Sequence, residues 1–311
     1  MITTLSPETG CFICSHLVGC RLQKDGYSHF LCKNCGHTEV RPMPEKKVLI
    51  DLYEEQYQYS NQKRLGLKFK NPYRWINTFD ENKKIKILDV GCADGQFLDF
   101  VKRNGFTELF GIELNKRLFN EAIQKGHKVV NGDLMEDFFK SQQFELINVG
   151  DVIEHVQDPF ELVSKLKRML TPNGKIVITT PDVASLWSKV TLRIHKATGI
   201  PWSSLTPPHH VHNFSHKSLC LLLASSGLNV ISEHSYSHNL VYELGQLHLK
   251  RKFTHSKSVM DFFRLVFGYL SYLVAHILCL CITIFVGRKF KMTLIAKPDL
   301  STTALKQTLV I

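Results

Sequence analysis

Ile85-Lys86-Ile87-Leu88-Asp89-Val90-Gly91-Cys92-Ala93-Asp94-Gly95-Gln96-Phe97 is the stretch of this 311-residue chain that decides its fold. A short apolar run ends at Val90, small residues occupy positions 91, 93 and 95, and an amphipathic segment begins at Gln96. The apolar run predicts a buried strand, and the amphipathic segment predicts a helix. Small residues let the backbone between them turn sharply and approach a ligand at the start of the helix.

The chain around this stretch continues the alternation of short apolar strands with helices of about ten residues. The predicted strands are 85–90, 109–113, 128–131, 144–149, 175–180, 228–236 and 291–296, and the predicted helices are 72–79, 96–104, 116–125, 159–170 and 216–226. The sequence Thr-Pro-Asn-Gly at 171–174 predicts a turn before the strand 175–180. This alternation predicts an α/β fold with a parallel, doubly wound sheet.

The loop at 91–95 departs from the dinucleotide-binding fingerprint, because Ala93 and Gln96 hold two of its glycine positions. It also lacks the lysine of a phosphate-gripping loop, so NAD and ATP are disfavoured as ligands. Glu113 ends the second strand, 22 residues after Gly91, where it can accept hydrogen bonds from ribose hydroxyls. Asp133 follows the third strand and is placed to meet an adenine amino group.

These motifs carry a family resemblance. Asp89–Gly95, Gly111–Glu113 and Asn131–Asp133 resemble the first motifs of class I S-adenosylmethionine-dependent methyltransferases. Gly150–Pro159 looks like the fourth-strand motif of the subgroup similar to ubiquinone-biosynthesis O-methyltransferases, and Leu170–Lys175 is similar to the turn before the fifth strand of that fold. The resemblance covers about residues 40–236 and 290–298 and implies a Rossmann-like sheet of seven strands.

The resemblance also implies roles for single residues. Asp89 and Gly91 would hold the methionine end of S-adenosylmethionine, Glu113 its ribose and Asp133 its adenine. The full set implied for cofactor binding is Asp89, Gly91, Cys92, Ala93, Gly95, Glu113, Asp133, Leu134 and Asp151. Many members have glycine at the position of Ala93, and a methyl group is tolerated there if the residue keeps a negative φ.

Methyl transfer needs alignment of the acceptor and removal of its proton. Asp151 would face the acceptor, and His155 is a candidate base or a residue that shapes its loop. His210 falls on the histidine of the P-x-H-x-x-x-F-S segment of the subgroup, where an imidazole can take a hydroxyl proton. His209 and His212 lie close to His210 in the sequence, so the three histidines could instead form a metal site or be ordinary loop residues.

Four of the nine cysteines form Cys11-x2-Cys14 and Cys32-x2-Cys35, separated by seventeen residues. This spacing is typical of a structural zinc site with four thiolates. Two disulfides or four ordinary thiols are the alternatives. Residues 1–10 have no basic start and no apolar run, so we expect a reducing cytoplasm, where thiolates bind metal.

The formal net charge of +11 is unevenly distributed. Residues 88–182 carry 11 basic and 15 acidic side chains, whereas residues 183–311 carry 14 and 4. The positive C-terminal third favours an anionic membrane surface first, and nucleic acid second, as a partner. A hydrophobic content of 44% excludes a disordered chain.

The stretch 265–287 contains 23 residues without Asp, Glu, Lys or Arg, which is long enough to span a bilayer. The predicted strands 228–236 and 291–296 belong to one sheet, however, so both ends of this apolar stretch must lie on one side of a membrane. A re-entrant or interfacial hairpin meets that requirement. We therefore expect peripheral or monotopic contact with the inner face of the membrane. A buried helix or dimer interface is the alternative.

The sequence thus predicts a zinc ribbon (1–40), a linker with N-terminal helices (41–80) and a methyltransferase domain (81–298). The last contains an acceptor lid (183–215) and an apolar membrane-contacting insert (258–288), and a tail (299–311) follows. The predicted activity is O-methylation of a small-molecule, glycan or lipid-linked acceptor near a membrane. An RNA or protein methyltransferase that grips its substrate with the ribbon, and a non-catalytic zinc and membrane adaptor, are the alternatives.

Overall fold

The computed structural model describes residues 10–24, 26–58, 73, 75–76, 83–198, 210–236, 259–286 and 290–299. The chain forms two compact units, each assembled from three separate segments. Unit 1 comprises residues 1–43, 181–218 and 235–292, and unit 2 comprises residues 44–180, 219–234 and 293–311.

Unit 2 is built on a seven-stranded sheet with the order β10-β11-β8-β7-β4-β5-β6. Its strands are β4 (Lys86–Val90), β5 (Glu108–Glu113), β6 (Lys128–Asn131), β7 (Phe144–Gly150), β8 (Leu170–Pro181), β10 (Leu228–Tyr236) and β11 (Lys291–Pro298). Parallel pairing joins β6 to β5, β5 to β4, β4 to β7 and β7 to β8. The strand order reverses direction between β4 and β7, and ligands of doubly wound sheets bind beside such a reversal. The predicted α/β fold is confirmed.

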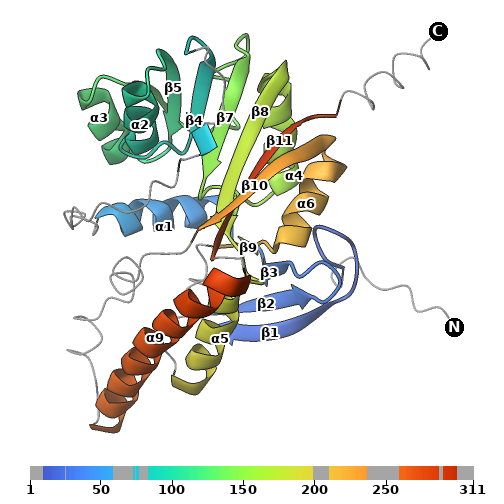
Figure 1. Cartoon of the computed structure of the whole chain (residues 1–311), viewed down its shortest axis with the longest axis vertical. Coiled ribbons are helices and arrows are strands. Elements are labelled where there is room, and N and C mark those ends of the chain that lie inside the picture. The colour runs from blue at the N-terminus through green and yellow to red at the C-terminus, as the bar shows by residue number, and fades with distance from the viewer. Residues whose placement is uncertain are drawn as a thin grey trace, which may run out of the picture. The chain divides into compact units, whose positions relative to one another are not determined.

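The helices of unit 2 begin and end close to their predicted positions. They are α2 (Gln96–Arg103), α3 (Lys116–Gln124), α4 (Pro159–Met169) and α6 (His216–Ser225). Asn115 caps α3 by accepting a hydrogen bond from the amide of Leu118 at 3.0 Å, and Asp158 caps α4 in the same way. Right-handed crossovers place α2 and α3 on one face of the sheet and α4 on the other, as Figure 1 shows to the left and right of the strands.

The predicted turn at 171–174 lies inside a longer strand. Phe144 on β7 pairs with Leu170, and Leu146 pairs with Lys175, so the four residues between them bulge out of the ladder. A side chain at Gly174 would come within 2.8 Å of the carbonyl oxygen of Phe144, which explains why glycine occupies this position.

Aromatic and aliphatic side chains between α2 and the sheet form the core of unit 2. Trp75 stacks on Phe97 of α2 with ring centroids 5.7 Å apart, and Ile87, Leu98 and Leu146 are fully buried in the same cluster. Residues 75–76 form a short 3₁₀ turn. The rest of the helix predicted at 72–79 lies outside the described residues, except Tyr73. A helix that was not predicted individually, α1 (Lys46–Gln58), precedes them.

Unit 1 contains a four-stranded sheet with the order β1-β2-β3-β9. The strands β1 (Val18–Lys24), β2 (Tyr27–Cys32) and β3 (Thr38–Arg41) form an antiparallel meander. The fourth strand, β9 (His212–Asn213), comes from much later in the chain and pairs antiparallel with β3. The N-terminal segment thus completes its sheet with residues of the predicted lid.

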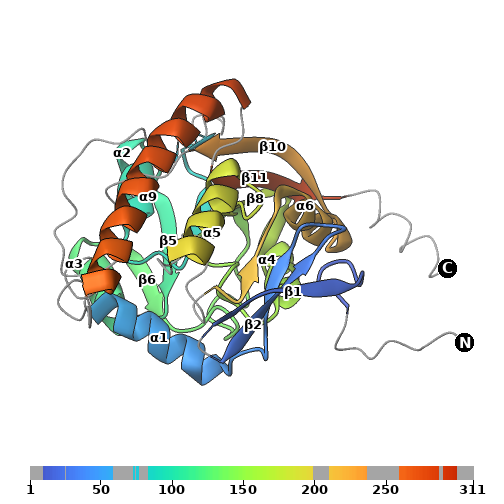
Figure 2. The same ribbon diagram turned by 90° about the horizontal axis from the view of Figure 1, so that it is seen from below.

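Two helices pack side by side in unit 1, as Figures 1 and 2 both show. They are α5 (Leu186–Thr198) and α9 (Val259–Val286). Trp187 of α5 makes edge-to-face contacts with Tyr272 and His276 of α9 at centroid distances of 4.9 and 5.0 Å. Among the described helices, none is both long and apolar enough to cross a membrane.

Several predictions fall on residues that the structure does not describe. They concern residues 199–209 of the lid, 258 and 287–288 of the apolar insert, and 300–311 of the tail. The boundaries of the predicted domains stay predictions.

Candidate functional site

Three residues of the loop between β4 and α2 have a left-handed backbone conformation: Gly91, Ala93 and Gly95. Gly91 has a φ of 67°, and a side chain there would come within 2.6 Å of Val152. Gly95 has a φ of 83°, and a side chain there would meet His127 at the same distance. These two glycines are therefore required by both backbone conformation and space.

Ala93 corrects one expectation from the sequence. Its φ is 48°, in the left-handed region, and not negative. The strain is offset by a hydrogen bond of 2.8 Å from the Ala93 amide to Oε2 of Glu113, which fixes the turn of the loop.

The carboxylate of Glu113 accepts hydrogen bonds from several parts of this site. Besides Ala93, its carboxylate accepts hydrogen bonds from the amide of Asn115 at 2.7 Å and from the Tyr53 hydroxyl at 3.0 Å, both at Oε1. The side chain is almost fully buried, and burial raises its pKa while these donors oppose the shift. Glu113 therefore connects the loop, the end of β5 and helix α1.

Asp89 lies one residue before the end of the neighbouring strand β4 and is buried. Its Oδ1 accepts a hydrogen bond of 2.8 Å from the side-chain Nδ2 of Asn148 on β7. Burial raises the pKa of Asp89 to about 7, the Asn148 hydrogen bond lowers it, and the charge of Glu113 raises it further. A carboxyl group with a pKa this close to neutral is typical of functional sites. Asn148 was not predicted, although a lone amide within the apolar run 144–149 is a signal for it.

Asp133 lies after β6, as predicted. One oxygen accepts a hydrogen bond of 2.9 Å from the Met135 amide, and the other forms an ion pair of 2.7 Å with Lys46 of α1. The ion pair raises the pKa of Lys46. Leu134 beside it is buried. Cys92, which was also implied for cofactor binding, packs its side chain into the core of unit 2.

Helix α1 thus contacts the two carboxylates that the sequence assigns to ribose and adenine. Tyr53 reaches Glu113 and Lys46 reaches Asp133, seven residues apart on the same helix. Seven residues are about two turns of a helix, so both side chains project from one face of α1. The aromatic residues at 53–59 gave only a weak signal for this contact, because the sequence does not show where a helix outside the sheet will dock.

The loop after β7 carries Asp151 and His155. Asp151 is exposed with a φ of 56°, and its amide donates a hydrogen bond of 2.8 Å to the carbonyl oxygen of Thr179. Between them, Glu154 is fully buried and accepts a hydrogen bond of 2.9 Å from Thr180. Glu154 therefore links this loop to β8.

His210 belongs to unit 1, at the start of the segment that forms β9. Val211 and Phe214 are fully buried next to it, and the carbonyl oxygen of Val211 accepts a hydrogen bond from Val40 at 3.0 Å. His212 is also fully buried, and its Nδ1 lies 3.1 Å from Nε2 of His37. His212 therefore serves the packing of unit 1, which leaves His210 as the candidate base of this segment.

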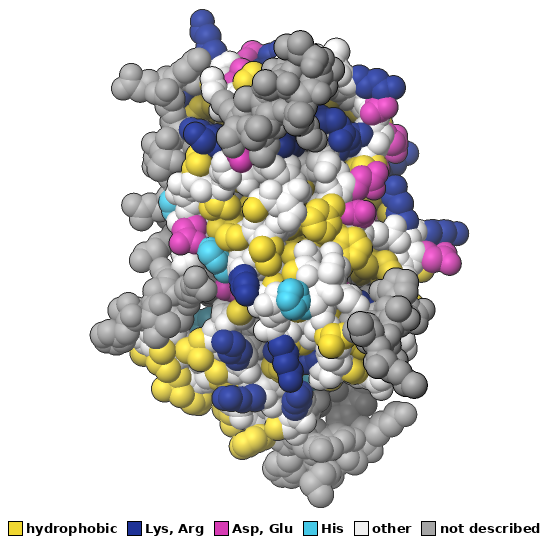
Figure 3. All heavy atoms as spheres, turned by 90° about the vertical axis from the view of Figure 1, so that its right-hand side faces the viewer, with side chains coloured by type: hydrophobic (Ala, Val, Ile, Leu, Met, Phe, Trp, Pro, Cys, Tyr) yellow, Lys and Arg dark blue, Asp and Glu magenta, His cyan; other side chains and the backbone are white. Residues whose placement is uncertain are grey.

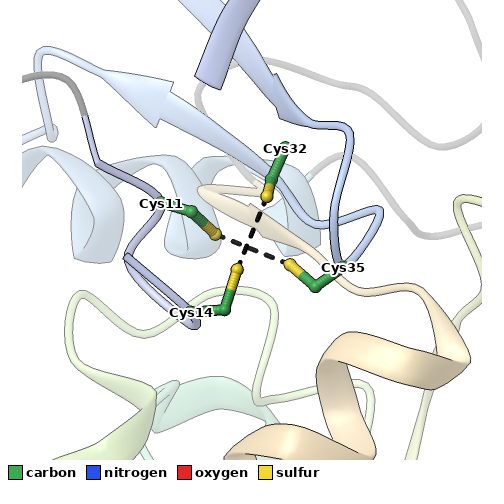
Figure 4. A group of neighbouring side chains, drawn as sticks. All are labelled: Cys11, Cys14, Cys32 and Cys35. Carbon is green, nitrogen blue, oxygen red and sulfur yellow. Dashed lines mark hydrogen bonds between the residues drawn. The ribbon is translucent and has the colours of Figure 1, made fainter. Parts of the chain in front are cut away.

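The four predicted zinc ligands converge in unit 1, and their sulfurs lie within 4.8 Å of one another (Figure 4). Cys11 and Cys35 have their sulfurs 3.6 Å apart, and those of Cys14 and Cys32 are 3.5 Å apart. Zn–S bonds of about 2.3 Å in a tetrahedron place sulfurs about 3.8 Å apart, whereas a disulfide brings them to about 2.05 Å. The donor set fits a zinc ion and does not contain disulfides.

The second cysteine knuckle is bonded to the segment that carries His210. The Ser215 hydroxyl donates a hydrogen bond to the carbonyl oxygen of Cys35, and Lys217 donates one to the carbonyl oxygen of Asn34 at 2.8 Å. Gly36 has a φ of 77°, and a side chain there would come within 3.1 Å of Ser215. The knuckle therefore depends on glycine for both its turn and its contact with Ser215.

Comparison with known proteins adds independent evidence. A family model for the methyltransferase domain matches residues 54–233, more than half of the chain. The ubiquinone biosynthesis O-methyltransferase of Pseudomonas syringae pathovar tomato is 28% identical over 124 residues, covering 35% of this chain and 51% of that protein. The mitochondrial protein of the same name from Dictyostelium discoideum is 23% identical over 167 residues, covering 46% and 52%. The chain spans about half the length of these curated relatives.

Among solved structures, magnesium protoporphyrin IX methyltransferase from Synechocystis PCC 6803, with bound SAH, has a TM-score of 0.52 at 12% identity. The superposition covers 82% of this chain and 100% of that one, and it shows a shared fold. Together with the strand order and the loop at 91–95, these matches confirm the family predicted from the motifs. The chain belongs to the methyltransferase domain family and has the class I S-adenosylmethionine-dependent methyltransferase fold.

Proposed function

We propose that this protein transfers the methyl group of S-adenosylmethionine to a hydroxyl oxygen of a small-molecule, glycan or lipid-linked acceptor near a membrane. The observation that carries the proposal is the pair of buried carboxyl groups, Asp89 and Glu113, at the adjacent ends of β4 and β5. They flank a loop that turns sharply at Gly91 and Gly95, which brings its backbone amides to the start of α2, where a ligand can bind. Relatives named as ubiquinone biosynthesis O-methyltransferases support a hydroxyl acceptor.

S-Adenosylmethionine supplies an activated methyl group, so the protein contributes binding, alignment and proton removal. Ionised Asp89 would pair with the ammonium group of the methionine moiety, while Asn148 fixes the orientation of its carboxylate. Glu113 would accept hydrogen bonds from the ribose. The Tyr53 hydroxyl donates a hydrogen bond to Glu113 of the kind that a ribose hydroxyl would donate.

Helix α1 therefore competes with the cofactor in this proposal. Tyr53 on Glu113 and Lys46 on Asp133 satisfy carboxylates that would otherwise face solvent or ligand. Binding of S-adenosylmethionine would replace the Tyr53 hydrogen bond with one from the ribose. The cost of losing the first bond would then reduce the affinity for the cofactor.

His210 is the proposed base that takes the acceptor proton, with His155 and Asp151 as further groups that contact the acceptor. The buried side chains of Val211 and Phe214 hold the His210 segment in one conformation. A positioned imidazole contributes about 10²–10⁴-fold to such a reaction. His210→Gln should therefore lower kcat by about 100-fold or more and leave the affinity for S-adenosylmethionine unchanged.

We also propose that Cys11, Cys14, Cys32 and Cys35 bind one structural zinc ion. Their sulfur spacing supports this, and all four positions of a tetrahedral ion would be filled by protein, as in structural sites. Purified protein should contain one equivalent of zinc. Cys32→Ser should lose the metal, whereas Cys20→Ser, which changes an exposed thiol outside the cluster, should keep it.

Isothermal titration calorimetry with S-adenosylmethionine tests the cofactor site. Glu113→Gln should weaken binding by at least about tenfold, because it removes a charge-assisted acceptor. Glu108→Gln at the other end of β5 is the matched control and should bind normally. Mass spectrometry of extracts incubated with the protein should then reveal one acceptor that gains a methyl group. Unchanged affinity in Glu113→Gln would refute the site.

A further inference from the structure

Helix α9 of unit 1 is apolar on two opposite faces. One face packs on α5 through Tyr272, Ala275, His276 and Cys279, which are all buried. The other face is exposed to solvent, and its large apolar side chains are 38–65% accessible. They are Phe267, Leu270, Leu273, Val274, Ile277, Leu278 and Ile282.

The spacing of the exposed residues makes them one continuous surface. Leu270, Val274, Ile277 and Leu278 follow one another at intervals of four, three and one, which places them on one side of a helix. No acidic or basic residue occurs between 265 and 287. An apolar surface of this length on a folded protein is a site of contact with a membrane or another protein.

Helix α5 supplies the charge that distinguishes these two partners. Lys189, Arg193 and Lys196 are exposed at intervals of four and three, so they form one basic stripe. The row Leu186, Val190 and Ile194, which packs against the α9 cluster, lies next to this stripe around the helix. No residue of α5 is acidic, and no ion pair to the stripe occurs within the described part of the chain.

Basic residues also flank helix α9 on both sides along the sequence. Lys250, Arg251, Lys252 and Lys257 precede α9, and Arg288 and Lys289 follow it. On the face drawn in Figure 3, lysine and arginine side chains gather toward the lower end, with hydrophobic side chains beside them. The apolar face of α9 combined with the basic stripe of α5 matches an anionic lipid surface, whose head groups are negative and whose acyl region is apolar.

We propose that α5 and α9 together form a surface that binds an anionic membrane. The exposed face of α9 enters the boundary between head groups and acyl chains, and the stripe on α5 contacts lipid phosphates and carboxylates. The helix lies in the plane of the interface. The inference extends the near-membrane part of the proposed function, but the binding itself requires neither cofactor nor methyl transfer.

Flotation of the full chain with vesicles tests this surface without S-adenosylmethionine, so that its result is independent of the catalytic assignment. The vesicles contain phosphatidylcholine with one third phosphatidylserine. We expect the protein to float with these vesicles and to bind pure phosphatidylcholine vesicles much more weakly. Leu270→Gln, Val274→Gln and Ile277→Gln in one variant should weaken binding by at least about tenfold.

The basic stripe is tested separately by changing Lys189, Arg193 and Lys196 together to Gln. Each basic residue at an anionic surface contributes about fivefold to affinity, so this variant should bind about 100-fold more weakly at low salt. All substituted side chains are exposed, and circular dichroism should show unchanged folding.

Two matched controls carry the same substitutions elsewhere. The first control removes three exposed apolar side chains of unit 2 in one variant, by Ile123→Gln, Val230→Gln and Ile231→Gln. The second control removes three exposed charges of unit 2 in one variant, by Lys102→Gln, Arg103→Gln and Lys116→Gln. Both controls should bind vesicles like the unchanged protein. Equal binding to both vesicle types, or equal loss in test and control variants, would overturn the proposal. So would a dimer, measured by light scattering, that the α9 variant converts to a monomer, because the face would then bind a second copy.

Discussion

Replacing Asp89 with Asn should stabilise the cofactor-free protein and impair cofactor binding at the same time. Asp89 is fully buried at the end of β4, and its Oδ1 accepts the hydrogen bond from Asn148. Asparagine retains a carbonyl oxygen that can accept this bond, and it cannot ionise. The substitution therefore removes the cost of a buried charge together with the charge that would attract the methionine ammonium.

The size of the effect follows from the pKa of Asp89. Its pKa rises from 3.8 to about 7 on folding, so the folded protein holds the proton more tightly than the unfolded chain. Between these values the unfolded chain gains free energy by ionising, and the stability of the unchanged protein falls as pH rises. Above pH 7 the loss of stability totals about 4 kcal/mol, at about 1.36 kcal/mol for each unit of pKa. Because the folded protein relaxes around the buried charge, roughly half of that is a realistic value.

Urea unfolding followed by tryptophan fluorescence measures this difference. The stability of Asp89→Asn relative to the unchanged protein should grow between about pH 4 and pH 7 and then level off. Asp94→Asn in the same loop is the control, because Asp94 pairs with Lys125 at a partly exposed site and contributes at most about 1 kcal/mol. The affinity of the unchanged protein for S-adenosylmethionine should rise as pH increases through about 7, as Asp89 ionises. A stability difference independent of pH, or normal cofactor affinity in the variant, would refute the reasoning.

Three further experiments test other parts of the structure. Tyr53→Phe removes a hydrogen bond to Glu113, so it should lower the free energy of unfolding by about 1 kcal/mol. Calorimetry should show cofactor binding about fivefold tighter, because the cofactor no longer competes with Tyr53 for Glu113. Weaker binding would contradict this competition. Ala93→Gly should raise the free energy of unfolding by about 1 kcal/mol, since the residue has a φ of 48°, whereas Ala197→Gly in helix α5 should lower it by a similar amount. Chelation of zinc should lower the melting temperature of the unchanged protein but not of Cys32→Ser, and an equal shift in both would exclude a zinc site.

The strands and helices of unit 2 could be predicted because their patterns are local. The apolar run of β4 and the small residues of the loop at 91–95 each act within a few residues. The spacing of the cysteines was also sufficient to bring four sulfurs together, since each pair lies on one tight turn. The family followed from the order of these local motifs along the chain.

The remaining features depend on contacts between distant residues. The sequence does not show that Tyr53 reaches Glu113 across 60 positions, or that Asn148 bonds to Asp89 across 59. The left-handed conformation of Ala93 depends on the same carboxylate. His212 is similar to His210 in the sequence, and only the pairing of β9 with β3 distinguishes the buried residue from the other.

The pairing of β3 with β9 determines when unit 1 can form during synthesis. Glu39 pairs with His212, so the N-terminal sheet waits for residues that are translated 173 positions later. At about 5–20 residues per second, this delay is roughly 10–35 s. Strands β4 to β8 emerge from the ribosome within that interval and can assemble first. A zinc ion bound to the N-terminal cysteines would hold the β1–β2 hairpin during the wait, while the edge of β3 stays unpaired until β9 is made.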